Sequence, residues 1–382
     1  MAEAFIVGAV RTPVGRRGGA LSAVHPADLG AHVLLAALDR SRADPGSVDD
    51  VFFGCVGQIG AQTGNIARTA WLSAGLPEHV PGTTIDRQCG SSQQAVHFAA
   101  QAVLSGAAHV VIAGGVELMS LVPIASPMTV GAGAGLGTPF GGESWARQYG
   151  DQEISQFRGA ELIADKWDVS RQDMEQFALR SHQRALTARA AGAFTEEIVP
   201  SFGLEADEGP RPDTTLEKMA GLNTLTSGGR LTAAVSSQIS DGAAALVVAS
   251  EHAVRSQRLT PLARVHSMTV VGSDPVLMLT GPIAATEKIL AMAGLSIEDI
   301  HLVEINEAFA PVVLAWQKEI GAPEERVNTV GGAIALGHPL GATGARLMTT
   351  LVHQLHRTGG RFGLQTMCEG GGMANATILE RM

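Results

Sequence analysis

The sequence predicts an α/β protein in which one strand–helix–strand unit occurs twice. Short apolar runs alternate with segments of helical periodicity, the pattern of a sheet covered by helices. Residues 88–116 contain no Asp, Glu, Lys or Arg, which predicts a buried segment. Cys89 in the first half and His338 in the second each precede a helix, then a strand that ends near glycines. Such a duplication would bring the N-termini of these two helices together near a pseudo-twofold axis.

The first half alternates strands and helices. An apolar strand opens the chain, and a glycine-rich, basic loop at 11–21 follows it. Cys55 lies in a strand, where we expect it to pack rather than react. A further strand delivers Cys89 to a helix that is apolar on nearly all sides and should be buried. The predicted elements are strands at 4–10, 51–56, 83–86 and 109–114, and helices at 27–41, at 65–74 and after Cys89.

The middle of the chain, from 117 to 239, is richer in polar residues and loops, and we expect an insertion that could cover a site. Residues 131–137 are glycine-rich and predict a flexible stretch, since they lack the spacing of a dinucleotide-binding fingerprint. Helices are predicted at 153–167 and 170–191, the second with a capping box at its start.

Regular elements then resume. We expect a helix with a proline in its first turn and a long helix after His338. The predicted elements are strands at 243–249, 262–271, 301–305 and 362–367, and helices at 281–293, 308–320 and 341–356.

Composition excludes several classes of function. The formal net charge is −10 without a basic block, which argues against nucleic acid as a partner. Three distant cysteines form no zinc-binding pattern, and so few fit a reducing cytoplasm. The N-terminus does not resemble a signal peptide, and no apolar run is long enough to cross a membrane. We therefore expect a cytoplasmic protein without a metal site.

Cys89 is the first candidate for chemistry. A thiol at the N-terminus of a helix feels the positive end of the helix dipole and unpaired backbone N–H groups. In that setting a cysteine becomes a thiolate nucleophile. The alternative is that Cys89 is simply a small buried residue, the commonest fate of a free cysteine.

Four short stretches contain reactive residues beside glycines or small residues. Taken singly, each has an ordinary structural explanation: His338 as a satisfied loop residue, Asn306 as a helix cap, Cys368 as packing at a strand end. The stretches are Cys89-Gly90-Ser91-Ser92, Asn306-Glu307-Ala308-Phe309-Ala310, 331–341 (GGAIALGHPLG) and Cys368-Glu369-Gly370-Gly371-Gly372.

Together these stretches resemble the thiolase family, and the resemblance runs essentially from end to end. It implies the thiolase fold, in which two similar βαβαβαββ domains form a five-layered αβαβα core with an inserted loop domain. The implied N-terminal domain is 1–115 plus 240–261, the loop domain is 116–239, and the C-terminal domain is 262–382. It also implies an acyltransferase that works on acyl-CoA thioesters, with coenzyme A as a co-substrate and no tightly bound cofactor.

The resemblance assigns a role to each catalytic residue. Cys89 attacks the thioester of a 3-oxoacyl-CoA after His338, as general base, takes its proton. The backbone N–H groups of Cys89 and Gly370 hold the oxyanion. Cys368 protonates the departing enolate of acetyl-CoA, while His338 and a water held by Asn306 stabilise the enolate oxygen. A second coenzyme A then takes the acyl group.

Ser237, within a segment at 236–243, matches a family serine that contacts coenzyme A, although a helix cap is the alternative explanation. The resemblance also implies that Met278, Ala308 and Phe309 line the coenzyme A or substrate site.

Three departures mark the branch of the family. The nucleophile is followed by Gly90-Ser91-Ser92-Gln93-Gln94, where the biosynthetic branch has Cys-x-Ser-Gly-Leu-Gln-Ala. Ser155-Gln156 stands where that branch has His-Met, and Asn223 where a basic residue helps to bind the cofactor. These variants resemble degradative thiolases of actinobacterial type, including those of steroid breakdown.

The resemblance therefore favours a thiolase that cleaves a 3-oxoacyl-CoA to acetyl-CoA (or propionyl-CoA) and a shortened acyl-CoA, in fatty-acid or steroid breakdown. The first alternative is a biosynthetic thiolase that condenses two acetyl-CoA. A β-ketoacyl synthase shares the fold but uses a cysteine with two histidines, a pattern that Asn306 and Cys368 do not fit. A non-catalytic acyl-CoA-binding relative would not need all four stretches. The family forms homodimers or homotetramers, and the resemblance leaves that choice, the acyl chain and the physiological direction open.

Overall fold

The computed structural model describes residues 2–382. Within this range ten strands form one mixed sheet in the order β4-β3-β5-β6-β1-β7-β10-β9-β8, with β2 beside β6. The strands are β1 (Ala4–Arg11), β2 (Gly15–Arg16), β3 (Asp50–Gly54), β4 (Thr83–Ile85), β5 (Val110–Leu118), β6 (Ser240–Ser250), β7 (Ala263–Gly272), β8 (Leu302–Ile305), β9 (Phe362–Glu369) and β10 (Met373–Arg381).

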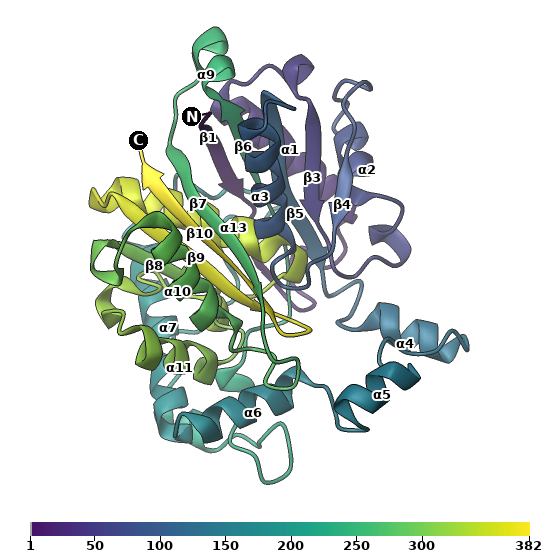
Figure 1. Cartoon of the computed structure of the whole chain (residues 1–382), viewed down its shortest axis with the longest axis vertical. Coiled ribbons are helices and arrows are strands. Elements are labelled where there is room, and N and C mark those ends of the chain that lie inside the picture. Colours follow the sequence, from purple (N-terminus) through teal and green to yellow (C-terminus); the bar gives the residue numbers. More distant parts are fainter. Residues whose placement is uncertain (1) are drawn as a thin grey trace.

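The sheet consists of two halves with the same strand order. In Figure 1 the first half is purple to blue except for β6, which is green, and the second half is green to yellow. β5 lies between parallel β3 and antiparallel β6, and β9 lies in the same way between β8 and β10. The first half ends at β4; at the matching edge of the second, a parallel bridge joins Val303 to Val327. The halves meet where Phe5 pairs with Arg264 and Ile6 with Ala263. The predicted duplication is confirmed.

Helices form layers between and outside the two halves. α3 (Ser91–Leu104) and α13 (Leu340–Thr358) pack against each other in the middle, and α13 contacts strands of both halves. α1 (Pro26–Ser41) and α2 (Ile66–Ser73) cover the outside of the first half. On the second half lie α10 (Gly281–Ala293) and, beside it, α11 (Ala310–Ile320). This is the five-layered αβαβα arrangement that the resemblance implied.

The apolar strands follow from these layers, because each strand is covered on both faces. In β1, Phe5 and Val7 join the core beneath α1, whereas Ala4 and Ile6 join the core around α3 and α13. Alternation of apolar and polar residues is therefore absent from this strand.

The N-termini of α3 and α13 lie together, as the duplication predicted. The backbone N–H of Ala345 donates to Ser92 Oγ at 2.9 Å. A Cβ on Gly344 would lie 2.3 Å from the backbone nitrogen of Gln93, so this crossing requires glycine. The residues that precede the two helices, Cys89 and His338, are thereby brought into one region.

The chain between β5 and β6 forms helices on one side of the sheet. α6 (Gln156–Lys166) and α7 (Arg171–Ala190) pack against α11, while α4 (Ser126–Gly133) and α5 (Glu143–Tyr149) project from the body in Figure 1. The capping box at Ser170 and Asp173 is present as predicted. The remaining helical elements are α8 (Leu216–Ala220), α9 (Glu251–Gln257), α12 (Ala333–Leu336), η1 (Pro45–Ser47), η2 (Gly60–Gln62), η3 (Ala233–Val235), η4 (Ile297–Asp299) and η5 (Glu324–Arg326).

The structure differs from the predicted elements in three places. The stretch at 131–137 is partly helical, because α4 extends into it. Cys55 lies one residue beyond the end of β3, with its thiol directed to Glu117. The last strand, β10, was not predicted; it turns back along β9 after the glycines and hydrogen-bonds with it as a hairpin. None of the helices in 2–382 combines the length and apolar character needed to cross a membrane.

Candidate active site

The Cys89 loop connects β4 to α3 and is held by the first residue of that helix. Ser91 Oγ donates to the carbonyl oxygen of Gln88 at 2.5 Å and accepts from the backbone N–H of Arg87 at 2.9 Å. Gln88 adopts a left-handed conformation with φ 49°, which turns the chain sharply just before Cys89. Cys89 remains partly exposed to solvent.

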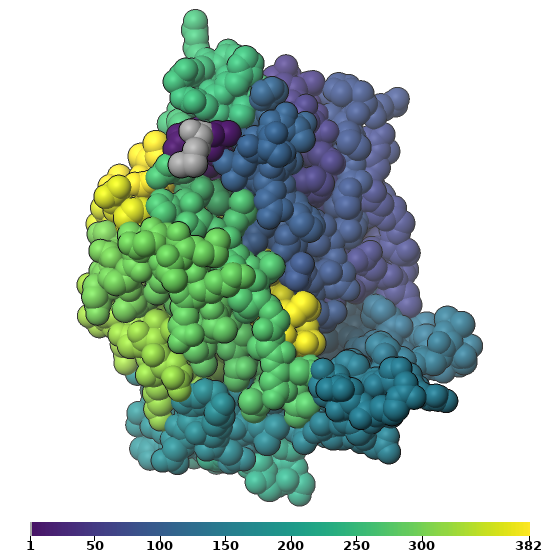
Figure 2. All heavy atoms as spheres, in the orientation of Figure 1, coloured from purple at the N-terminus to yellow at the C-terminus, as the bar shows by residue number. Residues whose placement is uncertain are grey.

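The β9–β10 hairpin brings the second thiol and Gly370 to Cys89. The backbone N–H groups of Gly370 and of Cys89 itself lie close enough to the Cys89 thiol to lower its pKa. Cys368 is fully buried, and Cys89 lies close enough to raise the pKa of the Cys368 thiol. The tip of the hairpin is visible in Figure 2, in yellow, in the hollow between the green and blue halves.

His338 is buried in the turn before α13, and its ring orientation follows from Thr343. Thr343 Oγ1 donates to the carbonyl oxygen of Pro339 at 2.7 Å and lies 2.6 Å from His338 Nδ1. Because the hydroxyl proton is used, Nδ1 must carry the proton that joins them. Nε2 is then free to accept a proton, and Asn306 Nδ2, 3.4 Å away, donates to it.

The protonation states differ from the expectation of a resting thiolate. Burial, followed by the charge of Glu369, raises the pKa of Cys89 to about 12, and the helix end does not compensate. Burial and then the charge of Arg346 lower the pKa of His338 to about 3. Near pH 7 the thiol is therefore protonated and the imidazole neutral, so Cys89 loses its proton only during the reaction.

The residues expected to line the coenzyme A or substrate site also lie together. Met278, Ala308 and Phe309 are buried in the same apolar core as Cys368. Ser237 donates its backbone N–H to the carbonyl oxygen of Ala308 at 2.9 Å. It follows η3 and its C-cap Ser236, so it caps the start of no helix in the described range.

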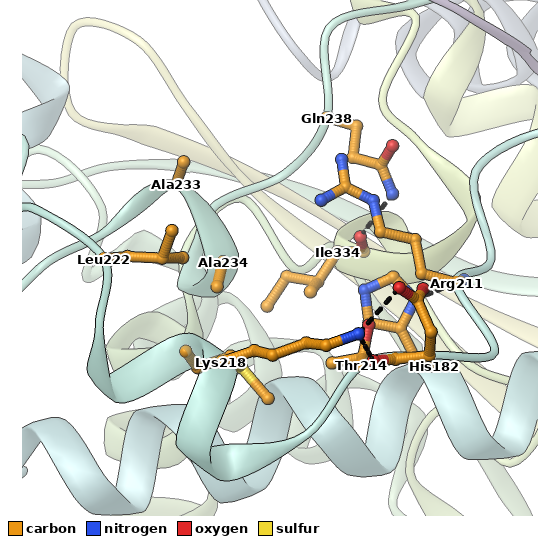
Figure 3. A pocket seen from close by; sticks show the side chains of 11 residues that line it. His182, Arg211, Thr214, Lys218, Leu222, Ala233, Ala234, Gln238 and Ile334 are labelled. Atoms are coloured by element: carbon orange, nitrogen blue, oxygen red, sulfur yellow. Dashed lines mark hydrogen bonds and ion pairs between the residues drawn. The ribbon is translucent and has the colours of Figure 1, made fainter.

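A cleft of about 170 Å³ adjoins the His338 turn. In Figure 3 the side chain of Arg211 lies beside Gln238, and Lys218 crosses the floor toward Thr214. Gln238 Nε2 donates to the backbone carbonyl oxygen of Ile334 at 2.9 Å. The backbone carbonyl oxygen of Gln238 accepts from the backbone N–H of His338. The cleft is lined by His182, Arg211, Asp213, Thr214, Lys218, Met219, Leu222, Ala233, Ala234, Gln238 and Ile334.

Two residues of the site were missed by the sequence analysis. Thr343 sits between alanine and glycine five residues after His338, a spacing that returns its hydroxyl to the turn at the helix start. Glu117 near the end of β5 is a buried carboxyl that accepts five hydrogen bonds, four from N–H groups and one from the Cys55 thiol. A lone acidic residue beside an otherwise uncharged run was the available signal.

Comparison with known proteins gives a family for the whole chain. Residues 4–252 match the Thiolase, N-terminal domain, and residues 259–381 match the Thiolase, C-terminal domain. The steroid 3-ketoacyl-CoA thiolase FadA6 of Mycobacterium tuberculosis is 59% identical over 387 residues, covering 100% of this chain and 95% of that protein. The 3-oxoadipyl-CoA/3-oxo-5,6-dehydrosuberyl-CoA thiolase of Escherichia coli is 44% identical, with 100% of both chains covered.

Solved structures agree with this relationship. The Bacillus anthracis acetyl-CoA acetyltransferase superposes with a TM-score of 0.90 at 38% identity, covering 100% of this chain and 99% of that one. Human mitochondrial 3-ketoacyl-CoA thiolase in complex with CoA superposes with a TM-score of 0.90 at 37% identity and the same coverage. The chain therefore belongs to the thiolase family and is an acyltransferase.

Proposed function

We propose that this thiolase cleaves a 3-oxoacyl-CoA with coenzyme A, through an acyl group carried on Cys89. The observation that supports the proposal is that the Cys89 and Cys368 thiols lie within electrostatic reach of each other, at the start of a helix that contacts the start of the helix after His338. Acyl transfer requires a nucleophile, a base and oxyanion donors, and carbon–carbon cleavage requires a separate acid.

The first half-reaction starts with transfer of the Cys89 proton to His338 Nε2. The thiolate attacks the 3-oxo carbonyl carbon, and the N–H groups of Cys89 and Gly370 hold the resulting oxyanion. The expected attack at the thioester carbon is wrong. The thiolate must attack C3, because the C2–C3 bond is the one that breaks. Only then does cleavage between C2 and C3 leave the shortened acyl group on Cys89.

Cleavage passes the electron pair to the departing enolate of acetyl-CoA (or propionyl-CoA). Asn306 Nδ2 and the protonated His338 stabilise the enolate oxygen, and Cys368 gives its proton to C2. Coenzyme A then passes its thiol proton to the Cys368 thiolate and attacks the acyl-cysteine. Cys89 leaves and recovers its proton from His338, so both thiols and the imidazole return to their starting states.

We place the coenzyme A portion along Ser237 and the cleft of Figure 3, with the chain between Cys89 and the cleft passing Met278, Ala308 and Phe309. Arg211 and Lys218 support this because phosphate groups bind to cations. They also supply positive charge in the region where Asn223 replaces the basic residue of other branches.

For the acyl group we propose a bulky, steroid-derived chain, since the 59% identical relative is a steroid thiolase. The names of several other relatives specify oxoadipyl groups, which are acyl chains with a second carboxylate. Condensation of two acetyl-CoA is the competing activity, and it is favoured by the likeness to an acetyl-CoA acetyltransferase.

We further propose the division of the chain into 1–115 plus 240–261, 116–239 and 262–382, which the sheet order supports. We also propose that the enzyme is cytoplasmic and forms a homodimer or homotetramer. Light scattering of the purified protein distinguishes these assemblies, and a monomer would contradict both.

A substrate panel tests the proposed function. The enzyme is incubated with coenzyme A and one of four substrates: acetoacetyl-CoA, a long straight-chain 3-oxoacyl-CoA, 3-oxoadipyl-CoA or a ring-bearing 3-oxoacyl-CoA. Loss of each substrate is followed by mass spectrometry. We expect coenzyme A-dependent cleavage, with the highest kcat/KM for the ring-bearing chain. Preference for acetoacetyl-CoA would refute the bulky substrate. Absence of cleavage with all four would favour an acyl-CoA-binding relative.

A further inference from the structure

Glu369 is a buried carboxyl beside both thiols that the proposed reaction does not use. It follows Cys368 at the end of β9 and is fully buried. Its charge raises the pKa of Cys89 and of Cys368, so it lies within electrostatic reach of both. A lone acidic residue in this position would make thiolate formation harder, which is the opposite of what a cysteine nucleophile needs.

The carboxyl rests directly on the residue that follows the nucleophile. A Cβ on Gly90 would lie 1.9 Å from Glu369 Oε1, and the same Cβ would lie 2.9 Å from Asn375 Oδ1. Gly90 has φ −83°, a conformation open to any residue, so it is the space that requires glycine here. Glu369, Asn375 and Gly90 are therefore packed together at the start of α3.

The hydrogen bonds around Glu369 lack a donor. Neither carboxyl oxygen has a hydrogen-bond partner of normal geometry, and the nearby backbone N–H of Asn375 only lowers the pKa. Asn375 Oδ1 also has no hydrogen-bond partner. The amide nitrogen of the same side chain, Asn375 Nδ2, lies 3.2 Å from Gln94 Oε1 and 3.4 Å from His97 Nδ1. Acceptors that face each other need a proton between them, and a protonated Glu369 can supply it.

The ionised form has a different partner available. Arg87, in the loop before α3, lies close enough to lower the pKa of Glu369, and its buried Nε is unpartnered. Burial outweighs this effect and raises the pKa of Glu369 to about 8. The other titratable groups nearby are Cys89, Cys368, Asp86 and His97; burial lowers the pKa of His97 to about 3, which keeps it neutral.

We propose that Glu369 is a positioning residue that controls the charge of the two-thiol site. The protonated carboxyl donates to Asn375 and leaves Cys89 free to give its proton to His338. When Glu369 releases its proton to solvent, the carboxylate turns to Arg87 and its charge holds both thiols in the protonated form. This inference rests on the proposed function only in naming Cys89 as the nucleophile.

Alkylation of Cys89 across pH tests the inference without requiring turnover. The wild type and Glu369→Gln are treated with iodoacetamide from about pH 6 to about pH 10, a range that brackets the Glu369 pKa of about 8. The alkylated Cys89 peptide is quantified by mass spectrometry. Because the Cys89 pKa of about 12 lies above this range, the readout is the rate of alkylation, which follows the small thiolate fraction. We expect the rate in Glu369→Gln to match the wild type near about pH 6 and to exceed it about tenfold near about pH 10, because a neighbouring negative charge has been removed. Superimposed profiles would overturn the proposal.

Control variants separate charge from folding. Glu369→Asp retains the charge and should keep the wild-type alkylation rates. Glu304→Gln neutralises another buried glutamate, whose pKa burial also raises to about 8, and should leave the Cys89 profile unchanged.

If Glu369→Gln fails to fold, Arg87→Gln gives the second test. Removing that cation keeps Glu369 protonated to higher pH, so Cys89 should be alkylated faster at pH above about 8. An unchanged rate in that variant would also overturn the proposal.

The outcome is distinguishable from failure of the proposed function. If this chain did not cleave 3-oxoacyl-CoA, the substrate panel would fail while the alkylation difference remained. If Glu369 did not control the thiols, cleavage would occur and the difference would be absent.

Discussion

Glu117 joins the two halves of the fold through Gly341. Glu117 Oε2 accepts a hydrogen bond from the backbone N–H of Gly341, three residues after the catalytic-base candidate His338, at 2.9 Å. The same carboxyl accepts from the backbone N–H groups of Val56 at 2.8 Å and Gly57 at 2.9 Å, and from Gln62 Nε2 at 2.8 Å. Each neighbour is a donor, so an ionised carboxylate satisfies the cluster even though burial raises its pKa.

Glu117→Gln should therefore destabilise the protein, because an amide places N–H groups against donors. We expect a loss of about 2–3 kcal/mol in the free energy of unfolding and a lower kcat, measured by urea denaturation and by steady-state kinetics. Glu208→Gln is the matched control: Glu208 also accepts two backbone N–H bonds, but nearer the surface. Equal losses in both variants would show that Glu117 has no special role.

The two reactive cysteines should separate by the step that they perform. Cys89→Ser should give no acyl-enzyme when incubated with acyl-CoA, whereas Cys368→Ser should acylate slowly and lose carbon–carbon cleavage. Intact-protein mass reports the acyl group, and product analysis reports cleavage. Cys55→Ala removes the third cysteine and should still acylate. Normal turnover of Cys89→Ser would contradict the mechanism.

Thr343 should matter for kcat because it determines which nitrogen of His338 carries the proton. Thr343→Val keeps the shape but removes the acceptor for Nδ1–H, so the imidazole can adopt the wrong tautomer. We expect kcat to fall by up to about 10²-fold, the lower end of what general-base catalysis contributes, with little change in KM. Thr343→Ser retains the hydroxyl and should restore activity; if Ser and Val variants are equally slow, the tautomer explanation fails.

Stability should decrease in acid because buried histidines are held neutral. Burial lowers the pKa of His97 and of His338 to about 3, against about 6.5 in an unfolded chain. Between those values the unfolded state binds more protons, so the free energy of unfolding falls as pH falls, by about 1.4 kcal/mol per pH unit for each histidine.

Urea denaturation from about pH 4 to about pH 7 measures this slope, because the range covers most of the interval between the two pKa values. His97→Gln should flatten it by the contribution of one histidine. His25→Gln, which replaces the exposed N-cap residue of α1, is the control for replacing a histidine that is not buried. A slope identical in the wild type and His97→Gln would mean that His97 does not titrate on unfolding.

Much of the chemistry could be predicted from short motifs. Cys89, His338, Asn306 and Cys368 became candidates for catalysis because their neighbours in the chain also match the family motifs. The duplicated sheet was predictable because apolar strands and helices recur in the same order in both halves. The observed ends of helices and strands differ from the predicted ends by a few residues. The strand β10 was missed because the glycines at 370–372 were interpreted as the end of the last strand.

The amino-acid sequence by itself determined the family and the order of the layers and singled out Cys89 as the candidate nucleophile, since these depend on local periodicity and contiguous motifs. Only the tertiary structure decided the protonation states: the helix end favours a Cys89 thiolate, but burial and Glu369 outweigh it and raise the pKa. Contacts such as Glu117 with Gly341 and Glu369 with Gly90 join residues more than 200 positions apart. They depend on strand register and helix crossing, which no local stretch of sequence specifies.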